Sequence, residues 1–151
     1  MVSQEVPIGN VVSYMRGITF KPEDKVDLGT LNSVVCMRTK NIQETLDEKD
    51  LISVPESFVR RDELFLKKGD VLISSANSWD LVGKCCLVPE LEYNATLGGF
   101  ISAVRMNPEK VDSNYFYRWL SSPSIQHKVR HLGRQTTNIS NLPVDQFLKL
   151  E

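Results

Sequence analysis

The apolar residues of this chain fall into short runs separated by polar segments, a pattern typical of short strands. Residues 34–37 and 71–73 are continuous apolar runs and predict two buried strands. A Lys-Lys-Gly-Asp turn signal at 67–70 precedes the second run. Residues 83–88 and the alternating residues 100–106 predict two more strands. Strands are therefore expected to be scattered over the first two-thirds of the chain.

The last third of the chain has helical spacing instead. Ser113 is expected to cap a helix that carries Phe116, Trp119 and Leu120 on one side. The Ser-Pro pair at 122–123 then predicts the start of a second helix, with proline at its first position. Its apolar residues recur at helical spacing and end before a glycine expected to stop it: Ile125, Val129, Leu132 and Gly133.

Polar or mixed segments connect these elements. The expected loops are residues 21–33, 38–41, 74–80 and 134–138. Residues 7–14 are expected to form a short helix that ends at Gly17, and residues 142–151 one more strand or the start of a helix. No internal repeat or Gly/Ser linker marks a domain boundary.

The order of elements favours an α+β fold over a regularly alternating α/β fold, because strands come first and helices follow. The 151 residues, 41% hydrophobic and 25% charged, fit one globular domain. We therefore expect residues 1–151 to form a single compact domain of mixed or antiparallel short strands, with its helices concentrated in the C-terminal third.

The sequence favours a cytoplasmic protein that does not bind a membrane. No apolar run approaches the roughly 20 residues of a membrane helix, and the N-terminus lacks a basic segment followed by an apolar one. Three cysteines, two of them adjacent, make a poor disulfide framework. Cys36, Cys85 and Cys86 are therefore expected to be reduced, buried thiols.

Charge is distributed unevenly along the chain, although the net charge is only -1. Residues 42–63 contain seven acidic and three basic residues. Residues 113–144 contain no acidic residue and four cations: Arg118, Lys128, Arg130 and Arg134. The sequence thus predicts a molecule with one acidic and one basic side, and the basic side is a candidate surface for nucleic acid.

No set of residues typical of a catalytic site is present. The sequence lacks a phosphate loop ending in Gly-Lys-Ser/Thr, a Gly-x-Ser-x-Gly elbow and the Asn/Asp-Pro-Pro-aromatic motif of amino-methyltransferases. His127 and His131 would share one helix face, but Cys85 and Cys86 lack the spacing of a zinc knuckle. We therefore expect no catalytic residue, no metal site and no bound cofactor.

Four segments carry a specific order and spacing: VVCMRTKNIQE at 34–44, LKKGDVLISSANSWDLVGKCCLV at 66–88, NYFYRWLSSPSIQHKV at 114–129 and HLGRQTTNISNLPVDQF at 131–147. Together they resemble the target recognition domain of a type I restriction-modification specificity subunit. The Lys-Gly-Asp turn alone is common, so the likeness depends on all four segments. It covers nearly the whole chain.

The resemblance implies a non-catalytic module that binds duplex DNA by sequence and supplies one half of target recognition. In that family, separate modification subunits hold S-adenosylmethionine and methylate adenine, and restriction subunits use ATP and cut; Mg is also expected only there. A specificity subunit usually carries two recognition domains, each followed by a long helix. In this chain the spacer helix is absent or only begun, so we expect a fragment, an isolated domain or a truncated product.

The polar loops supply the side chains that reading DNA requires. Arginine can form two hydrogen bonds with guanine, asparagine or glutamine two with adenine, and Lys, Arg, Ser and Thr contact phosphates. The candidate DNA-binding residues are Arg38, Lys40 and Asn41 in one loop, Ser75, Asn77 and Ser78 in a second, and Arg134, Gln135, Thr136, Thr137 and Asn138 in a third, flanked by Lys128 and Arg130. This interpretation requires them to gather on one concave side.

Three alternatives stay open on the sequence alone. The chain could be the recognition domain of a single-chain adenine methyltransferase, which shares this kind of fold. It could be a protein-interaction adaptor that uses the acidic residues 42–63, which predicts an exposed apolar patch there. It could also be an enzyme with an unrecognised site, which predicts a cleft containing a perturbed histidine or carboxylate.

Overall fold

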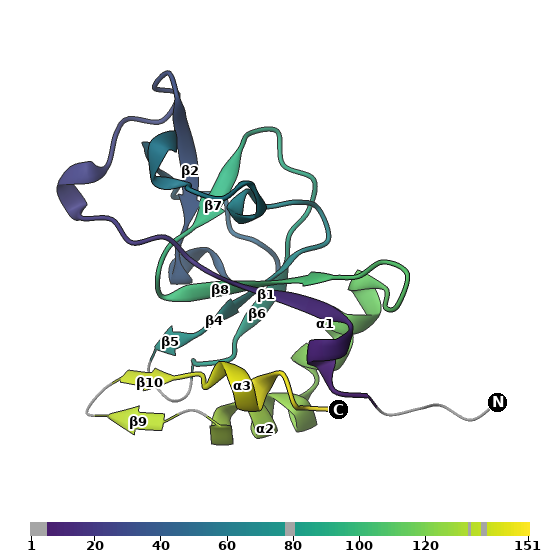
Figure 1. Cartoon of the computed structure of the whole chain (residues 1–151). Coiled ribbons are helices and arrows are strands. Elements are labelled where there is room, and N and C mark those ends of the chain that lie inside the picture. Colours follow the sequence, from purple (N-terminus) through teal and green to yellow (C-terminus); the bar gives the residue numbers. More distant parts are fainter. Residues whose placement is uncertain (1–5, 78–80, 133, 137–138) are drawn as a thin grey trace.

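The computed structural model of the chain describes residues 6–77, 81–132, 134–136 and 139–151, and only the backbone of 76–77, 134–136 and 139–141 (Figure 1). The strands in this part are β1 (Val12–Arg16), β2 (Ser33–Met37), β3 (Ile52–Pro55), β4 (Val71–Ser74), β5 (Ala76–Asn77), β6 (Cys85–Leu87), β7 (Ala95–Leu97), β8 (Ile101–Met106), β9 (Arg134–Thr136) and β10 (Ile139–Asn141). The α-helices are α1 (Ser113–Ser121), α2 (Pro123–Leu132) and α3 (Val144–Phe147). Short 3₁₀ helices lie at Ile8–Asn10, Pro22–Asp24, Thr39–Asn41, Glu56–Phe58 and Asp62–Leu64.

An antiparallel sheet in the order β1-β8-β4-β6 forms the middle of the molecule. β8 is paired on both sides, so Val104 lies opposite Tyr14 on β1 and opposite Val71 on β4. At the other end of the β4–β8 pair, Ser74 lies opposite Ile101. Because these two strands run in opposite directions, the end of β4 and the start of β8 emerge at the same edge of the sheet.

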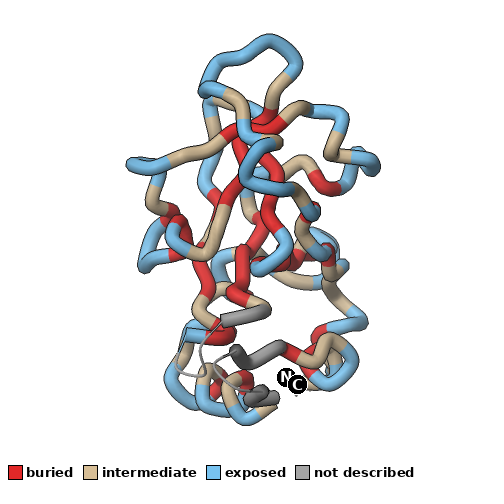
Figure 2. Tube along the Cα trace, turned by 90° about the vertical axis from the view of Figure 1, so that its left-hand side faces the viewer, coloured by how far each residue is buried: buried red, intermediate tan, exposed pale blue. Residues whose placement is uncertain are grey.

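Both faces of this central sheet are buried. Leu72 and Ala103 belong to a cluster with residues of β2, β3 and β7, whereas Val71, Ile73 and Val104 belong to a second cluster with residues of α1, α2 and α3. Buried stretches accordingly run along the middle of the molecule (Figure 2). Burial on both faces explains why residues 71–73 are apolar without alternation.

Two smaller sheets lie on either side of the central one. In the upper sheet, β2 pairs antiparallel with β3 and parallel with β7. In the lower sheet, β10 pairs antiparallel with both β9 and β5 (Figure 1). Leu142 continues the lower sheet, because its amide donates to the Ser75 carbonyl at 2.8 Å. The backbone after β4 is thereby joined to the C-terminal hairpin.

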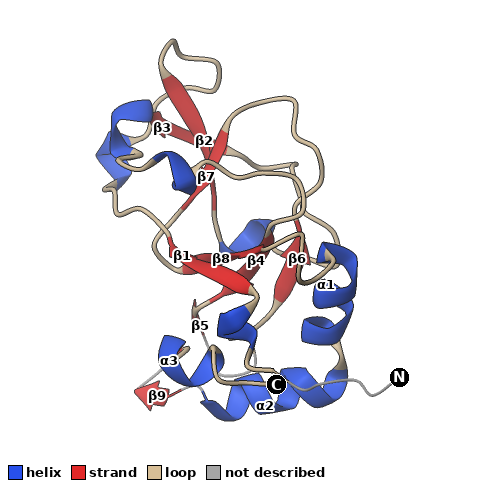
Figure 3. Ribbon diagram, turned by 45° about the vertical axis from the view of Figure 1, so that its right-hand side comes forward, coloured by secondary structure: helices blue, strands red, loops and turns tan. Residues whose placement is uncertain are grey.

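The helices α1 and α2 follow one another along the right-hand and lower sides of the domain (Figure 3). Asp112 caps α1, since its carboxylate accepts the amide of Tyr115 at 3.0 Å. Phe116 and Leu120 face the core from α1, and Ile125 and Val129 do so from α2. The amphipathic spacing in the sequence therefore corresponds to real buried faces.

A buried ion pair fixes one end of the central sheet. Asp70, which is 1% exposed, accepts two hydrogen bonds of 2.8 Å from the Arg105 guanidinium and one of 2.9 Å from the Lys67 amide. The same guanidinium donates to the Phe65 carbonyl at 2.9 Å. The preceding turn requires Gly69, whose φ is 95°. These contacts join the loop in front of β4 to the end of β8.

The expected α+β domain with late helices is confirmed, as are the four predicted strands and the second helix. Four local predictions were wrong. Residues 7–14 form a 3₁₀ turn and enter β1, because pairing with β8 overrides local helical spacing. The cap of α1 is Asp112 and not Ser113. The polar segments 74–80 and 134–138 contain β5 and β9.

Two strands, β3 and β7, were not predicted, and the end of the chain contains the short helix α3. The expected stop at Gly133 lies outside the described residues. The cysteine prediction is confirmed: Cys36, Cys85 and Cys86 are free and buried, and burial raises the pKa of each thiol to about 12. Cys85 and Cys86 face opposite sides of the central sheet, as consecutive strand residues do.

Replacing Asp70 tests the weight of the buried ion pair. Asp70→Ala leaves Arg105, whose side chain is 22% exposed, without its partner. We expect the free energy of unfolding to fall by about 3–5 kcal/mol. Urea denaturation followed by circular dichroism measures the change. The matched control is Arg61→Ala, which breaks the exposed Arg61–Glu63 pair and should cost less than about 1 kcal/mol. Equal losses in the two variants would contradict the assignment.

Candidate nucleic-acid interface

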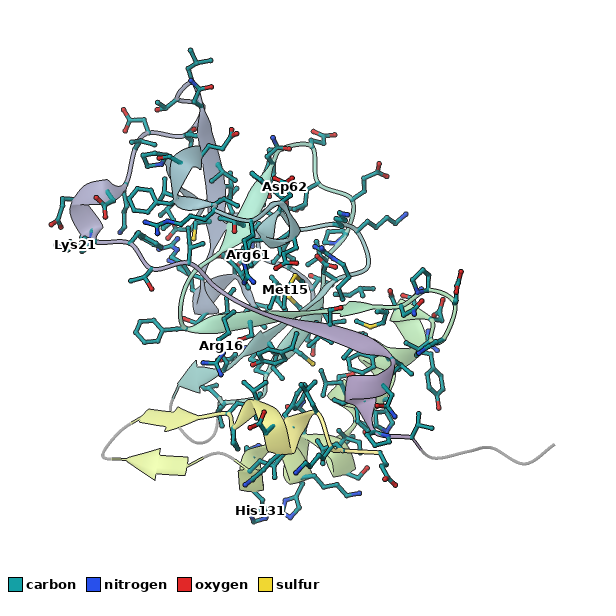
Figure 4. All side chains as sticks on the ribbon, viewed as in Figure 1. Met15, Arg16, Lys21, Arg61, Asp62 and His131 are labelled. Carbon is teal, nitrogen blue, oxygen red and sulfur yellow. The ribbon has the colours of Figure 1, made fainter. Side chains whose placement is uncertain are left out.

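Three adjoining hollows lie around the ends of β1, β2 and β4 and the start of β8, the region where Figure 4 labels Arg16. The largest, about 590 Å³, is called here the Phe100 hollow. The other two, each about 260 Å³, are the Tyr14 hollow and the Lys84 hollow. Gly99 lines the first and second, and Thr39 lines the first and third. The three hollows are therefore neighbours, and together they are called here the concave face.

The concave face is basic although the chain as a whole is not. The chain has 18 Lys and Arg residues against 19 Asp and Glu residues. Among the described residues, however, no carboxylate lines any of the three hollows. The cations that line them are Arg16, Lys25, Arg38, Lys40 and Lys84. Such a grouping attracts a polyanion.

The Phe100 hollow lies between the upper and the central sheet. Its floor is apolar and includes the buried Ile18 and Ile101, while Lys25 and Arg38 contribute its charge. Arg38 donates to the carbonyl of Asp50 at 2.9 Å and forms an ion pair with its carboxylate at 3.4 Å. Its Nε is enclosed and has no hydrogen-bond partner in the described structure. One donor of this guanidinium is thus unused.

The Tyr14 hollow is lined by hydroxyl groups beside a cation. Ser102 donates to Ser75 at 3.0 Å, and the enclosed Tyr14 hydroxyl has no partner in hydrogen-bonding geometry among the described residues. Burial raises the pKa of Tyr14, and the nearby Ser102 hydroxyl and Arg16 oppose this effect only in part. The phenol therefore keeps its proton at neutral pH and can donate a hydrogen bond. Arg16 itself is exposed at the rim (Figure 4).

The Lys84 hollow contains a chain of polar contacts. Lys84 donates to the side-chain oxygen of Gln43 at 2.8 Å, and Gln43 donates to the Lys40 carbonyl at 3.1 Å. Lys40 also forms an ion pair with Asp50, which lies outside the hollows. The hydrogen bond with Lys40, together with the charges of Lys40 and Arg38, holds the pKa of Asp50 below its ordinary value. Asp50 therefore restrains two cations of the concave face at neutral pH.

Three candidates from the sequence, Arg38, Lys40 and Ser75, line the concave face. Asn41 does not, and its proposed role in reading a base is corrected. It is 1% exposed; its side-chain oxygen accepts the Arg38 amide at 2.8 Å, and its amide donates to the carbonyls of Asp47 and Asp50. Asn41 thus shapes the loop that carries Arg38 and Lys40, because all of these bonds are internal.

The second and third candidate loops meet in the lower sheet. The backbone of Asn77 pairs with Ser140 on β10, and Gln135 on β9 pairs with the same residue from the other side. Arg134 and Thr136 lie on β9 with it. Ser78, Thr137 and Asn138 lie outside the described residues. Lys128 and Arg130 lie on α2 and do not line the hollows, although α2 leads into β9.

Sequence reasoning missed Arg16, Lys25, Lys84 and Phe100 on this face. Arg16 was hidden by the wrong helix prediction, since only the pairing of β1 with β8 brings it here. Lys25 and Lys84 come from segments without a motif. Arg16 and Lys84 could have been found by their position next to a strand end, where loops commonly carry binding residues. Lys25 follows a 3₁₀ helix and has no such signal.

Features expected of rival functions are not seen in the described part of the chain. No histidine, cysteine or carboxylate lines the three hollows. The rings of His127 and His131 approach with their Nε2 atoms 2.9 Å apart, but the described residues contain no group of three or more metal-binding side chains. Large exposed hydrophobic residues do not occur within residues 42–63. None of the described helices has the length and apolar character needed to cross a membrane.

Two curated proteins are similar in sequence to this chain over almost its full length. The chain is 28% identical over 143 residues to the specificity subunit of the type I restriction enzyme StySPI from Salmonella potsdam. It is 27% identical over 143 residues to the specificity subunit of the type I restriction enzyme EcoKI from Escherichia coli (strain K12). Each match covers 93% of the chain. The chain is a relative of type I restriction enzyme specificity subunits. It spans 30% of the length of each, about one domain. No family model matches the chain.

Solved structures from type I restriction-modification systems share the fold of this chain. The S subunit from M. genitalium superposes with a TM-score of 0.61 at 16% identity, covering 95% of the chain and 32% of that subunit. A structure described in terms of complex assembly and conformational transition of the type I R-M system gives 0.63 at 14% identity, covering 97% and 32%. The HsdS subunit from Thermoanaerobacter tengcongensis gives 0.55 at 13%, covering 94% and 33%.

Replacing Asn41 tests its structural role. Asn41→Ala leaves one amide and two carbonyls without their buried partner, so we expect the free energy of unfolding to fall by about 2–3 kcal/mol. Urea denaturation checks this, with Gln43→Ala in the same loop as the control, expected to cost less than about 1 kcal/mol because Gln43 is exposed. Unchanged stability together with a loss of DNA affinity at one base position would restore Asn41 as a reading residue.

Proposed function

We propose that residues 1–151 form one non-catalytic target recognition domain that binds duplex DNA by sequence. In this proposal the domain supplies one half of target recognition for a type I restriction-modification complex. The observation that carries the proposal is the concave face, where five cations and no carboxylate from the described chain line three neighbouring hollows. The named relatives, which are specificity subunits of type I restriction enzymes, support the same role independently.

The concave face offers the two kinds of contact that DNA recognition needs. Lysine and arginine at its rim neutralise phosphates and release counterions, which gives affinity but no sequence information. Sequence is read by groups that reach base edges. Arg38 is the described candidate for this task, because its guanidinium matches guanine and the residue lines the Phe100 hollow. Asn77, Arg134, Gln135 and Thr136 remain predicted readers on the adjoining lower sheet.

The chemistry of the complex belongs to other chains in this proposal. The modification subunits would hold S-adenosylmethionine, and the restriction subunits would hold ATP and Mg. All of these subunits would lie in the same cellular compartment as this protein. The names of the relatives and the structural neighbour described in terms of complex assembly support membership of a type I complex. The cofactors of the other subunits stay a prediction. A recognition domain of a single-chain methyltransferase would use the same surface, but both named relatives belong to type I enzymes.

Removing exposed cations from the concave face should weaken DNA binding. Arg16→Ala and Lys25→Ala should each lower the affinity for every duplex sequence. Each should also reduce the slope of log affinity against log salt by about 0.9, the value for one lost phosphate contact. Fluorescence anisotropy with a mixed-sequence duplex, between about 50 and 200 mM salt, measures both quantities.

Two variants serve as controls of opposite expectation. Arg118→Ala removes an exposed cation from α1, on the side of the domain away from the β9–β10 hairpin, and should change neither quantity (Figure 1). Asp50→Asn removes the carboxylate that holds Arg38 and Lys40 and should raise the affinity. Identical affinity and salt slope in wild type, both cation variants and Asp50→Asn would refute the placement of DNA on this face.

Sequence selectivity needs a separate measurement. Selection from a pool of random duplexes by the wild-type chain should enrich one short motif. The motif is short because a single recognition domain spans no more than about one turn of the DNA helix. Sequencing of the bound fraction identifies it. Salt-dependent binding without any enriched motif would make the chain a non-specific binder and contradict the recognition role.

A further inference from the structure

Phe100 is an exposed aromatic side chain on the basic concave face. Its 64% exposure is unusual for phenylalanine, which is usually buried. The ring lines the largest hollow beside Lys25 and Arg38. Gly99, its neighbour in the chain, lines both this hollow and the Tyr14 hollow, so Phe100 lies close to the boundary between them. An exposed aromatic ring is thus presented beside two cations.

The backbone of Phe100 is fixed and does not belong to a loose loop. The Gly98 amide donates to the Met37 carbonyl at 2.9 Å, and the Ile101 amide donates to Gly98 at 3.2 Å. The Phe100 carbonyl accepts the Ser75 amide at 3.2 Å. The turn also crosses Gly17 so closely that a Cβ there would lie 1.7 Å from the Gly98 carbonyl oxygen. The ring is therefore held out on a rigid support.

The charges around the ring indicate what covers it. A partner protein with an apolar side chain would have to bring it into a face that contains cations and no described carboxylate. A nucleic acid fits this charge, and it also offers one apolar group in its major groove, the 5-methyl group of thymine. A phenyl ring on a fixed backbone, in a hollow with cations that can hold phosphates, matches that group.

We propose that Phe100 is a specificity-determining residue that packs against the 5-methyl group of one thymine in the bound duplex. The inference rests on the proposed DNA-binding function and deepens it. The ring buries more apolar area where the methyl group is present, so it favours thymine over cytosine at one position. Lys25, in the same hollow, holds an adjacent phosphate, and Arg38 beside it remains the candidate for reading a guanine.

The test uses the duplex motif that the wild-type chain enriches from a random pool. Each thymine of the motif is replaced in turn by uracil, which removes only the methyl group. In the wild type, one replacement should lower affinity about fourfold, the value of one buried methylene-sized group, and the others should not. Phe100→Ala should bind the thymine and uracil duplexes equally, while Phe100→Leu should keep part of the preference.

A control variant and the alternative outcomes complete the test. Tyr115→Ala, which removes the exposed aromatic of α1 (68% exposed), should keep the full uracil effect. The thymine contact is refuted if the wild type binds every uracil duplex as well as its thymine parent. It is also refuted if Phe100→Ala lowers the affinity for the thymine and the uracil duplexes by the same factor. If the wild type binds no duplex at all, the proposed function itself fails. Unchanged thermal unfolding of Phe100→Ala verifies that the fold is intact.

Discussion

The bidentate ion pair between Arg105 and Asp70 fixes the strand register on which the concave face depends. It ties the start of β4 to the end of β8 with two hydrogen bonds of 2.8 Å, and Asp70 is buried. Since β4 and β8 are antiparallel, a fixed register at this end also fixes the other, where Ser74 and Ser75 meet Ile101 and Phe100. A shift by one residue would turn every side chain of these strands to the opposite face. The buried pair therefore positions groups that it does not touch.

Charge on this domain is organised in space and not in sequence. The cations of the concave face come from β1, the segment after Pro22–Asp24, the loop after β2 and the turn before β6. Between them lie the acidic residues 42–63, of which Asp50 restrains two of these cations from outside the hollows. The net charge of -1 is thus compatible with a strongly basic surface on one side. Local field, and not total charge, decides whether a polyanion binds.

Sequence reasoning predicted the elements that depend on local pattern and missed those that depend on pairing. The run at 71–73 and the amphipathic faces of α1 and α2 are visible locally because burial imposes them. β1 is defined by its partner β8, and β9 by β10, so neither could be seen in isolation. The same limit applies to the site. Arg38 and Lys40 stood out beside a strand, whereas Asn41 looked equally suitable until its bonds inside the loop were known.

The size of the basic surface bears on how one domain can act. If each of the five cations neutralised one phosphate, the slope of log affinity against log salt would be about -4.5. This slope is much smaller in magnitude than that of a large repressor. Most of such an affinity is insensitive to sequence, so a lone domain has little free energy left for choosing a site. A second recognition half on the same assembly raises the effective concentration at the first, and overall affinity then rises without any new contact on either domain. A rigid apolar contact such as that proposed for Phe100 is useful in this setting, because its contribution depends on the base and not on the salt.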